Sequence, residues 1–90
     1  MSKSKMIQNK LDRLNEITGS PKEPWVKTDE GFKAQVGNFH LDRAYGGVRL
    51  VRMMNTSGGE TDLSPRVSES RMLEILTTLL NVRDELKRIL

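Results

Sequence analysis

The sequence predicts an α+β fold: an N-terminal helix, a three- or four-stranded antiparallel β-meander, and a long C-terminal helix packed on one sheet face. Residues 39–54 alternate in polarity around a glycine pair, which is typical of a β-hairpin. Residues 4–18 and 68–90 instead repeat apolar residues every three or four positions, as amphipathic helices do. A chain of 90 residues suffices for one domain with a thin core, so we expect a single domain over residues 1–90.

The first helix is expected over residues 4–18. Its apolar side chains fall on one narrow stripe, formed by Ile7, Leu11, Leu14 and Ile17. Gly19 suits the position just after the helix, and Pro21 prevents the helix from continuing. Because a helix with so narrow a stripe is marginal in isolation, we expect it to dock on another element.

Residues 25–37 allow two interpretations. Phe32, Ala34 and Val36 alternate as in a strand, and the alternation changes phase at Gly37, which predicts either one bent strand over residues 32–44 or two short ones. A short helix capped by Thr28 and ended by Gly37 is the alternative, since Phe32 and Val36 would share one of its faces.

The central hairpin is expected to turn at Gly46-Gly47, because both positions of a type I′ turn need positive φ. This turn pairs Tyr45 with Val48, Arg43 with Leu50, Leu41 with Arg52, and Phe39 with Met54. Six of these eight residues are apolar or aromatic, so their shared face is the expected core face. The opposite face is expected to be wetter, with a weak ion pair between Asp42 and Arg49; it carries His40, Asp42, Ala44, Arg49, Val51 and Met53.

The remainder predicts a short third strand and a long helix. Residues 60–63 follow a second glycine turn, and Ser68 is placed to cap a helix, with Val67 and Met72 spaced for a hydrophobic staple. The helix stripe consists of Met72, Ile75, Leu79, Val82, Leu86 and Ile89. Residues 69–80 are expected to pack on the sheet, whereas residues 81–90 present a narrower seam. That seam receives the first helix or, in the alternative, forms a homodimer through Val82, Leu86 and Ile89.

The residues predict a binding protein and not an enzyme. The chain has a single histidine, no cysteine and no phosphate-binding glycine loop, so we expect no catalytic residues, no metal and no cofactor. No apolar run is long enough to span a bilayer, and the polar N-terminus does not predict a signal peptide. The absence of cysteine fits a reducing compartment, so a cytoplasmic location is expected.

A protein is the expected partner. The alternatives are a nucleic-acid-binding module and a structural or assembly protein that dimerises through the C-terminal helix. The net charge is +3, and arginines form a candidate rim that would contact either partner. The candidate binding residues are Arg43, Arg49, Arg52, Arg66 and Arg71, with His40 and Trp25. Arg43 and Arg52 interrupt the apolar face, which indicates either side chains that reach the solvent or an anion site. The order helix, three strands, helix resembles the double-stranded-RNA-binding domain in topology, but the lysine cluster and the Gly-Pro-x-His loop of that module are missing.

A second resemblance comes from three short motifs, Ala44-Tyr-Gly-Gly-Val-Arg-Leu50, Asn55-x-x-Gly-Gly59 and Ser68-x-x-x-Met-Leu73. Over roughly residues 38–80 they resemble a set of small uncharacterised tailed-bacteriophage proteins with an aromatic-Gly-Gly hairpin between helices. The resemblance implies an accessory protein that binds a host or phage macromolecule in the cytoplasm of an infected bacterium. Inhibition of a host defence or regulatory system is an expected mode of action. The family implies no reaction and no site residues.

Overall fold

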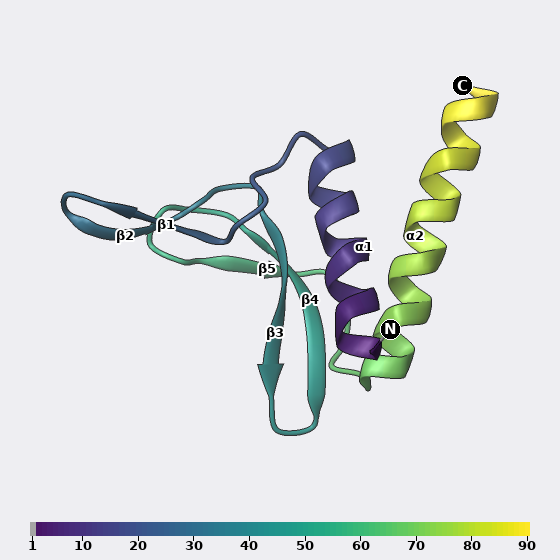
Figure 1. The fold of residues 1–90 in the computed structure, drawn as a ribbon, viewed down its shortest axis with the longest axis horizontal. Helices are drawn as coiled ribbons and strands as arrows, with labels where there is room; N and C mark the ends of the chain where they lie inside the picture. Colours follow the sequence, from purple (N-terminus) through teal and green to yellow (C-terminus); the bar gives the residue numbers. More distant parts are fainter. Residues whose placement is uncertain (1) are drawn as a thin grey trace.

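The computed structural model describes residues 2–90, which form an α+β fold of two helices and five antiparallel strands in two small sheets (Figure 1). The predicted fold class is confirmed. The elements are α1 (Lys3–Ile17), β1 (Trp25–Thr28), β2 (Gly31–Ala34), β3 (Phe39–Ala44), β4 (Gly47–Met53), β5 (Glu60–Asp62) and α2 (Glu69–Ile89). Strands β3, β4 and β5 form the expected meander, whereas β1 and β2 pair only with each other in a separate hairpin.

Local signals set both ends of α1, within a residue of the predicted bounds. The Ser2 side chain accepts a hydrogen bond from the Lys5 amide and caps the first turn. At the other end Gly19 has a φ of +69° and donates to the Glu16 carbonyl, while Ser20 donates to the Asn15 carbonyl at 2.8 Å. These two bonds form a Schellman motif, which confirms the role predicted for Gly19.

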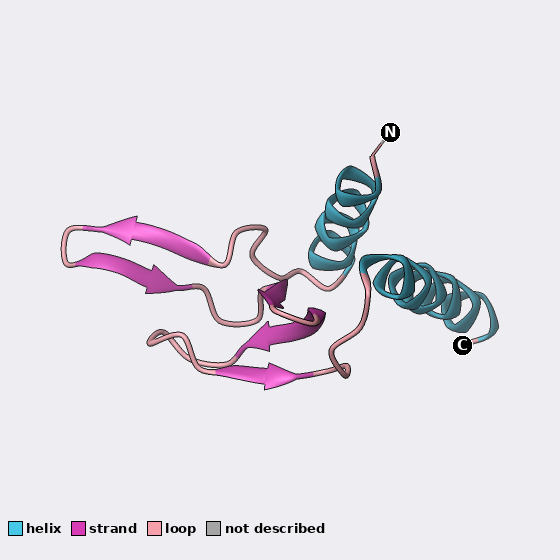
Figure 2. Cartoon of the chain, turned by 90° about the horizontal axis from the view of Figure 1, so that it is seen from below, coloured by secondary structure: helices cyan, strands magenta, loops and turns pink. Residues whose placement is uncertain are grey.

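The segment over residues 25–37 contains the two strands β1 and β2 and no helix, so the short-helix alternative was wrong. Of the two strand interpretations the structure has the second, in which β2 and β3 are separate and Gly37, with a φ of +94°, lies in the bend between them. The β1–β2 hairpin, hereafter the arm, extends away from both helices (Figures 1 and 2).

The predicted hairpin register was wrong by one position at the turn. Gly46 and Gly47 both have positive φ, at +97° and +129°, but the ladder continues to a pair between Ala44 and Gly47. Tyr45 and Gly46 are therefore the connection, and Leu41 lies opposite Leu50. Side chains alternate with period two, so moving the turn by one residue changed every partner but kept these leucines on one face.

The turn is shifted because the β4 backbone pairs with a segment that is distant in the sequence. The Val48 amide donates to the Val67 carbonyl at 2.7 Å, and the Val67 amide donates back at 2.8 Å. This bridge brings the Val67 carbonyl so close that a Cβ on Gly47 would overlap it. Gly47 is thus required for close approach of two backbones, and Gly46 alone serves the turn.

Both helices cover the same face of the meander, where the main core lies. The core consists of six buried side chains from α1, β4 and α2: Ile7, Leu11, Val48, Leu50, Met72 and Leu76. Val67 packs against it, as the predicted staple with Met72 requires. The N-termini of the helices lie side by side, joined by a hydrogen bond from Lys3 to Ser70 at 2.6 Å. The first half of α2 thus packs on β4 as predicted and also on α1.

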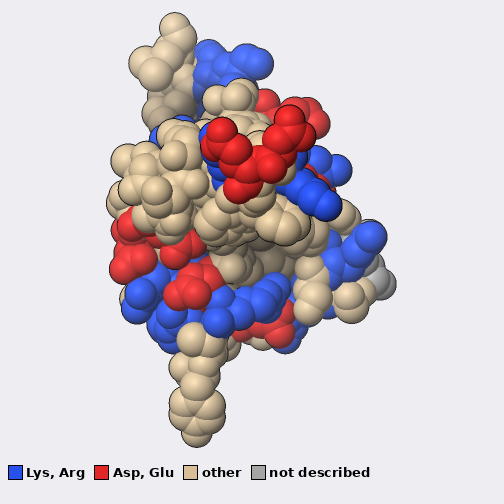
Figure 3. Space-filling model, turned by 90° about the vertical axis from the view of Figure 1, so that its left-hand side faces the viewer, with Lys and Arg blue, Asp and Glu red and all other residues tan. Residues whose placement is uncertain are grey.

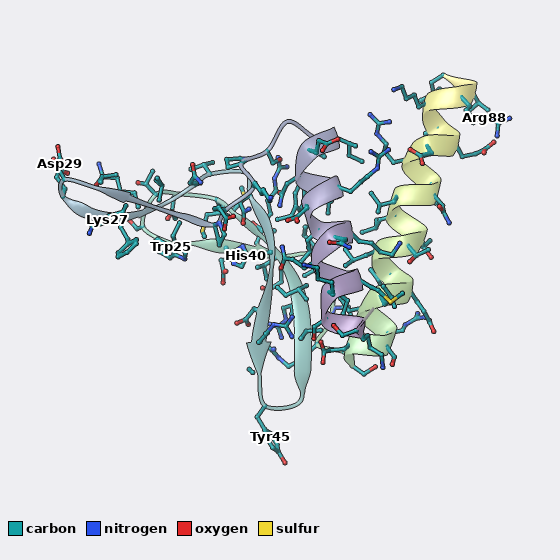
Figure 4. The ribbon with its side chains drawn as sticks, viewed as in Figure 1. Trp25, Lys27, Asp29, His40, Tyr45 and Arg88 are labelled. Atoms are coloured by element: carbon teal, nitrogen blue, oxygen red, sulfur yellow. The ribbon has the colours of Figure 1, made fainter. Side chains whose placement is uncertain are left out.

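Two predicted core residues are exposed, and two residues of the predicted wet face are buried. Tyr45 is fully exposed because the register shift places it at the hairpin tip (Figure 4), and Met54 is exposed because it follows the end of β4. On the opposite face Val51 and Met53 are fully buried. The arm closes over that region: Ala34 of β2 donates to a carbonyl in the turn after β4. The prediction of a wetter second face was therefore wrong at these two positions.

We expect Gly47→Ala to destabilise the protein more than Gly46→Ala. A side chain at positive φ costs about 1–2 kcal/mol at either position, and at Gly47 it must also displace the Val67 backbone. Urea unfolding monitored by circular dichroism would measure the free energy of unfolding of both variants. A variant that shows no cooperative transition would count as the more destabilised of the two. Equal costs at the two positions would contradict the assignment of separate roles.

Candidate functional site

The predicted arginine rim is engaged in contacts within the chain. Arg49 bonds the Asp62 carboxylate at 3.1 Å, and Arg66 bonds the Asp42 carboxylate at 2.6 Å. Arg66 also donates to the carbonyls of Asp42 and Gly47. The expected pair between Asp42 and Arg49 is replaced by these two, because β5 and the segment before α2 bring other partners within reach.

Two further arginines pair with acids of α2. Arg43, whose side chain is 54 % exposed, lies 3.5 Å from the Glu69 carboxylate in the first turn of α2. Arg71 bonds Glu74 one turn later on the same helix. Such exposed pairs contribute little to stability, but they neutralise charge that the rim would otherwise offer to an anion.

Arg52 is held by stacking. Its guanidinium carbon lies 4.7 Å from the centre of the Phe39 ring, and its Nε donates to the Gly37 carbonyl at 3.1 Å. This is a cation–π contact on a partly buried side chain. The five arginines therefore all have partners, and the structure does not gather them into one unpaired basic surface.

His40 joins three segments of the chain (Figure 4). Buried Asn38 donates its amide hydrogens to the carbonyls of Pro21 and Lys22, so its oxygen accepts from His40 Nδ1 at 3.0 Å. His40 Nε2 faces the Glu60 carboxylate at 2.5 Å, a contact that becomes an ion pair when the ring is protonated. This arrangement links β3 to β5 and to the segment before β1, which is a structural role.

Trp25 lies at the base of the arm, with its ring against Gly58. It is 45 % exposed, and Phe32, on the same face of the arm, is 70 % exposed. Val26 of β1 is also exposed, as is Val36 just after the arm. The arm therefore presents exposed apolar side chains to the solvent, and Trp25 is one of them.

The second half of α2 presents an uncovered apolar stripe. Its members, hereafter the α2 seam, are Leu79, Val82, Leu86 and Ile89, with exposures of 43 %, 50 %, 46 % and 69 %. Figure 1 shows this end of α2 diverging from α1, so the seam does not receive the first helix. Neither helix of residues 2–90 is long and apolar enough to cross a membrane.

A groove of about 380 Å³ runs between α1, the segment before β1, and β3. Figure 3 shows that the surface beneath the arm is hollowed and bordered by charges of both signs. The groove, hereafter the β3 groove, is lined by Gln8, Leu11, Asp12, Lys22, Glu23, Pro24, Phe39, His40, Leu41 and Arg43. Only His40 and Arg43 of the predicted binding residues contribute to it.

One residue that sequence reasoning missed bonds Phe39, which lines this groove. Asn15 is 2 % exposed; its side-chain nitrogen donates to the Phe39 carbonyl at 3.0 Å, and its oxygen accepts from the Phe39 amide at 2.8 Å. The available signal was its position four residues after Leu11, on the buried side of the helix.

The described residues, 2–90, contain no group of three or more His, Cys, Asp or Glu side chains that could hold a metal ion. Comparisons of the chain with protein-family models, curated protein sequences and solved structures found no match. The candidate surfaces therefore rest on geometry alone.

We expect Asn15→Ala to destabilise the protein by about 2–4 kcal/mol, because it leaves two part-buried backbone groups of Phe39 without their partner. Glu16→Ala, at the exposed neighbouring position, is the matched control and is expected to change the free energy of unfolding little. Urea unfolding of the two variants would test this. Equal stability of N15A and E16A would show that the pair of hydrogen bonds does not hold α1 on β3.

Proposed function

We propose that this protein is a non-enzymatic protein-binding module that uses the α2 seam as its main contact surface. The observation that carries the proposal is the exposure of four large aliphatic side chains in one row. Contiguous apolar patches on small proteins mark interaction sites more often than isolated apolar residues do.

The lengths of the helices support this role. Their N-termini are level, α1 has 15 residues and α2 has 21. At about 1.5 Å per residue, α2 reaches roughly 9 Å beyond the end of α1. The last turns of α2 therefore extend past their helical neighbour, and a partner that covered the seam would complete the burial of its stripe.

A second copy of the chain fits the seam. Its residues alternate at spacings of three and four, which is the pattern of a two-helix seam that packs against itself. Four charges beside the seam form two ion pairs, since Arg88 pairs with Glu85 and Arg83 lies 4.0 Å from Asp84. Because the row is short, it buries less than the roughly 800 Å² per partner of a stable interface, so the proposed homodimer is weak and exchanges readily with a monomer or another protein.

The resemblance to small tailed-bacteriophage proteins supports an accessory role in an infected bacterium. In that role the protein binds a host or phage macromolecule, and inhibition of a host defence or regulatory system would follow from occupying a surface of its target. A weak self-association through the seam would be replaced by the target, because both use the same apolar row.

We expect a double variant, Val82→Ser with Leu86→Ser, to be monomeric at concentrations where the unaltered protein self-associates. Two apolar contacts at the centre of the seam are lost on each copy. Asn81→Ser, on the exposed polar side of the same helix, is the control and should associate as the unaltered protein does. Sedimentation equilibrium from 10 µM to 1 mM, on the order of concentrations where such weak interfaces form, would measure this. A strict monomer for the unaltered protein throughout would refute self-association through the seam.

The nucleic-acid alternative receives less support, because all five candidate arginines have partners within the chain. We expect no retardation of duplex DNA or duplex RNA in gel-shift experiments at low salt. Retardation at low salt that disappears as salt is raised would instead indicate phosphate contacts and would favour that alternative.

A further inference from the structure

Strand β3 forms one edge of the meander, and its outward backbone groups can be identified from the bonds of β4. Leu50, opposite Leu41, donates its amide to the Ser64 hydroxyl at 2.9 Å and accepts from the Leu63 amide at 2.8 Å. Its backbone is thus directed away from β3. In an antiparallel ladder, two opposite residues either bond each other or both direct their N–H and C=O away from each other. Because Leu50 directs its groups away from β3, those of Leu41 point away from β4, to the open edge of the sheet.

The same reasoning applies one pair further along the strand. Val48, opposite Arg43, uses its amide and its carbonyl in the bridge to Val67. The N–H and C=O of Arg43 therefore also point outward. No hydrogen bond between residues 2–90 accounts for these outward groups of Leu41 and Arg43.

Phe39 precedes Leu41 by two residues, so its N–H and C=O also point to the open edge. There they are already bonded by a side-chain amide. The Asn15 side chain donates to the Phe39 carbonyl and accepts from its amide, at 3.0 and 2.8 Å. These are the two bonds that a residue of an added strand would form there. The Asn15 side chain thus forms with Phe39 the hydrogen bonds that a peptide group of an added strand would form. Such a strand could continue from there along the edge of β3.

The β3 groove provides the space for that continuation. His40 and Leu41 are neighbours on β3 and point to opposite sheet faces, yet both line the groove, so it runs along the strand edge. Leu11 of α1 and Leu41 are the leucines among its lining residues. The other edge of the meander is less suitable, since β5 is three residues long and carries Glu60 and Asp62.

We infer that the β3 groove binds an extended peptide segment of a partner protein, which adds to the sheet as a strand beside β3. The backbone of the peptide bonds the outward groups of Leu41 and Arg43, and an apolar side chain packs against Leu11 and Leu41. The inference goes beyond the proposed function, because it adds a second binding surface and names the form of the partner that this surface takes. It uses a surface separate from the α2 seam, so either can fail without the other.

The test begins with a displayed library of random heptapeptides selected on the unaltered full-length protein. The selected peptides are expected to alternate apolar and polar residues. Arg43→Pro removes the outward N–H, and proline is accepted at edge positions whose N–H faces away from the sheet. It should weaken binding at least tenfold, whereas Arg43→Ala, which keeps the N–H, should weaken it less than threefold. Amide spectra of both variants verify that they fold.

A second measurement keeps the test decisive if Arg43→Pro does not fold. The best selected peptide is made with a single N-methyl group at each position in turn, and alternate positions should lose binding, because only one edge of an added strand faces β3. The seam variant V82S/L86S should bind the peptide as the unaltered protein does. Failure to select any peptide, equal binding by R43P and R43A, or tolerance of N-methylation at every position would overturn the inference.

Discussion

The two hydrogen bonds between the Asn15 side chain and the Phe39 backbone fix how α1 lies against the sheet. The apolar stripe of α1 is narrow, and apolar packing is not directional, so Ile7 and Leu11 alone would allow the helix to slide or rotate. A buried amide that must satisfy two backbone groups allows one position. That position packs α1 on β3, lets α2 pack against α1 and β4, and leaves the groove along the rest of β3.

Much of the fold followed from local sequence signals. The ends of both helices were set by Ser68, Gly19 and similar capping positions, which act through bonds within one turn. The hairpin register was set by the bridge between Val48 and Val67, a contact between segments whose approach no local pattern reveals. The glycine pair therefore predicted a hairpin correctly and its turn incorrectly, and Tyr45 moved from the expected core to the tip.

The candidate site was less predictable than the fold. Charge pattern located the arginines but not their partners, since Arg49 with Asp62 and Arg66 with Asp42 are pairs formed by the tertiary arrangement. The α2 seam was predictable because its spacing is contained in one helix. The β3 groove was not, because the direction of a backbone N–H depends on strand register and leaves no trace in residue type.

The central claim is that Asn15 ends the open edge of β3 and that the edge beyond it is unpaired. Amide hydrogen exchange of the free protein, measured residue by residue, tests this most directly. The account predicts slow exchange at Phe39, His40 and Asp42, whose amides are bonded by Asn15 or β4, and fast exchange at the outward-facing amides of Leu41 and Arg43. Protection of Leu41 and Arg43 equal to that of their neighbours would contradict it.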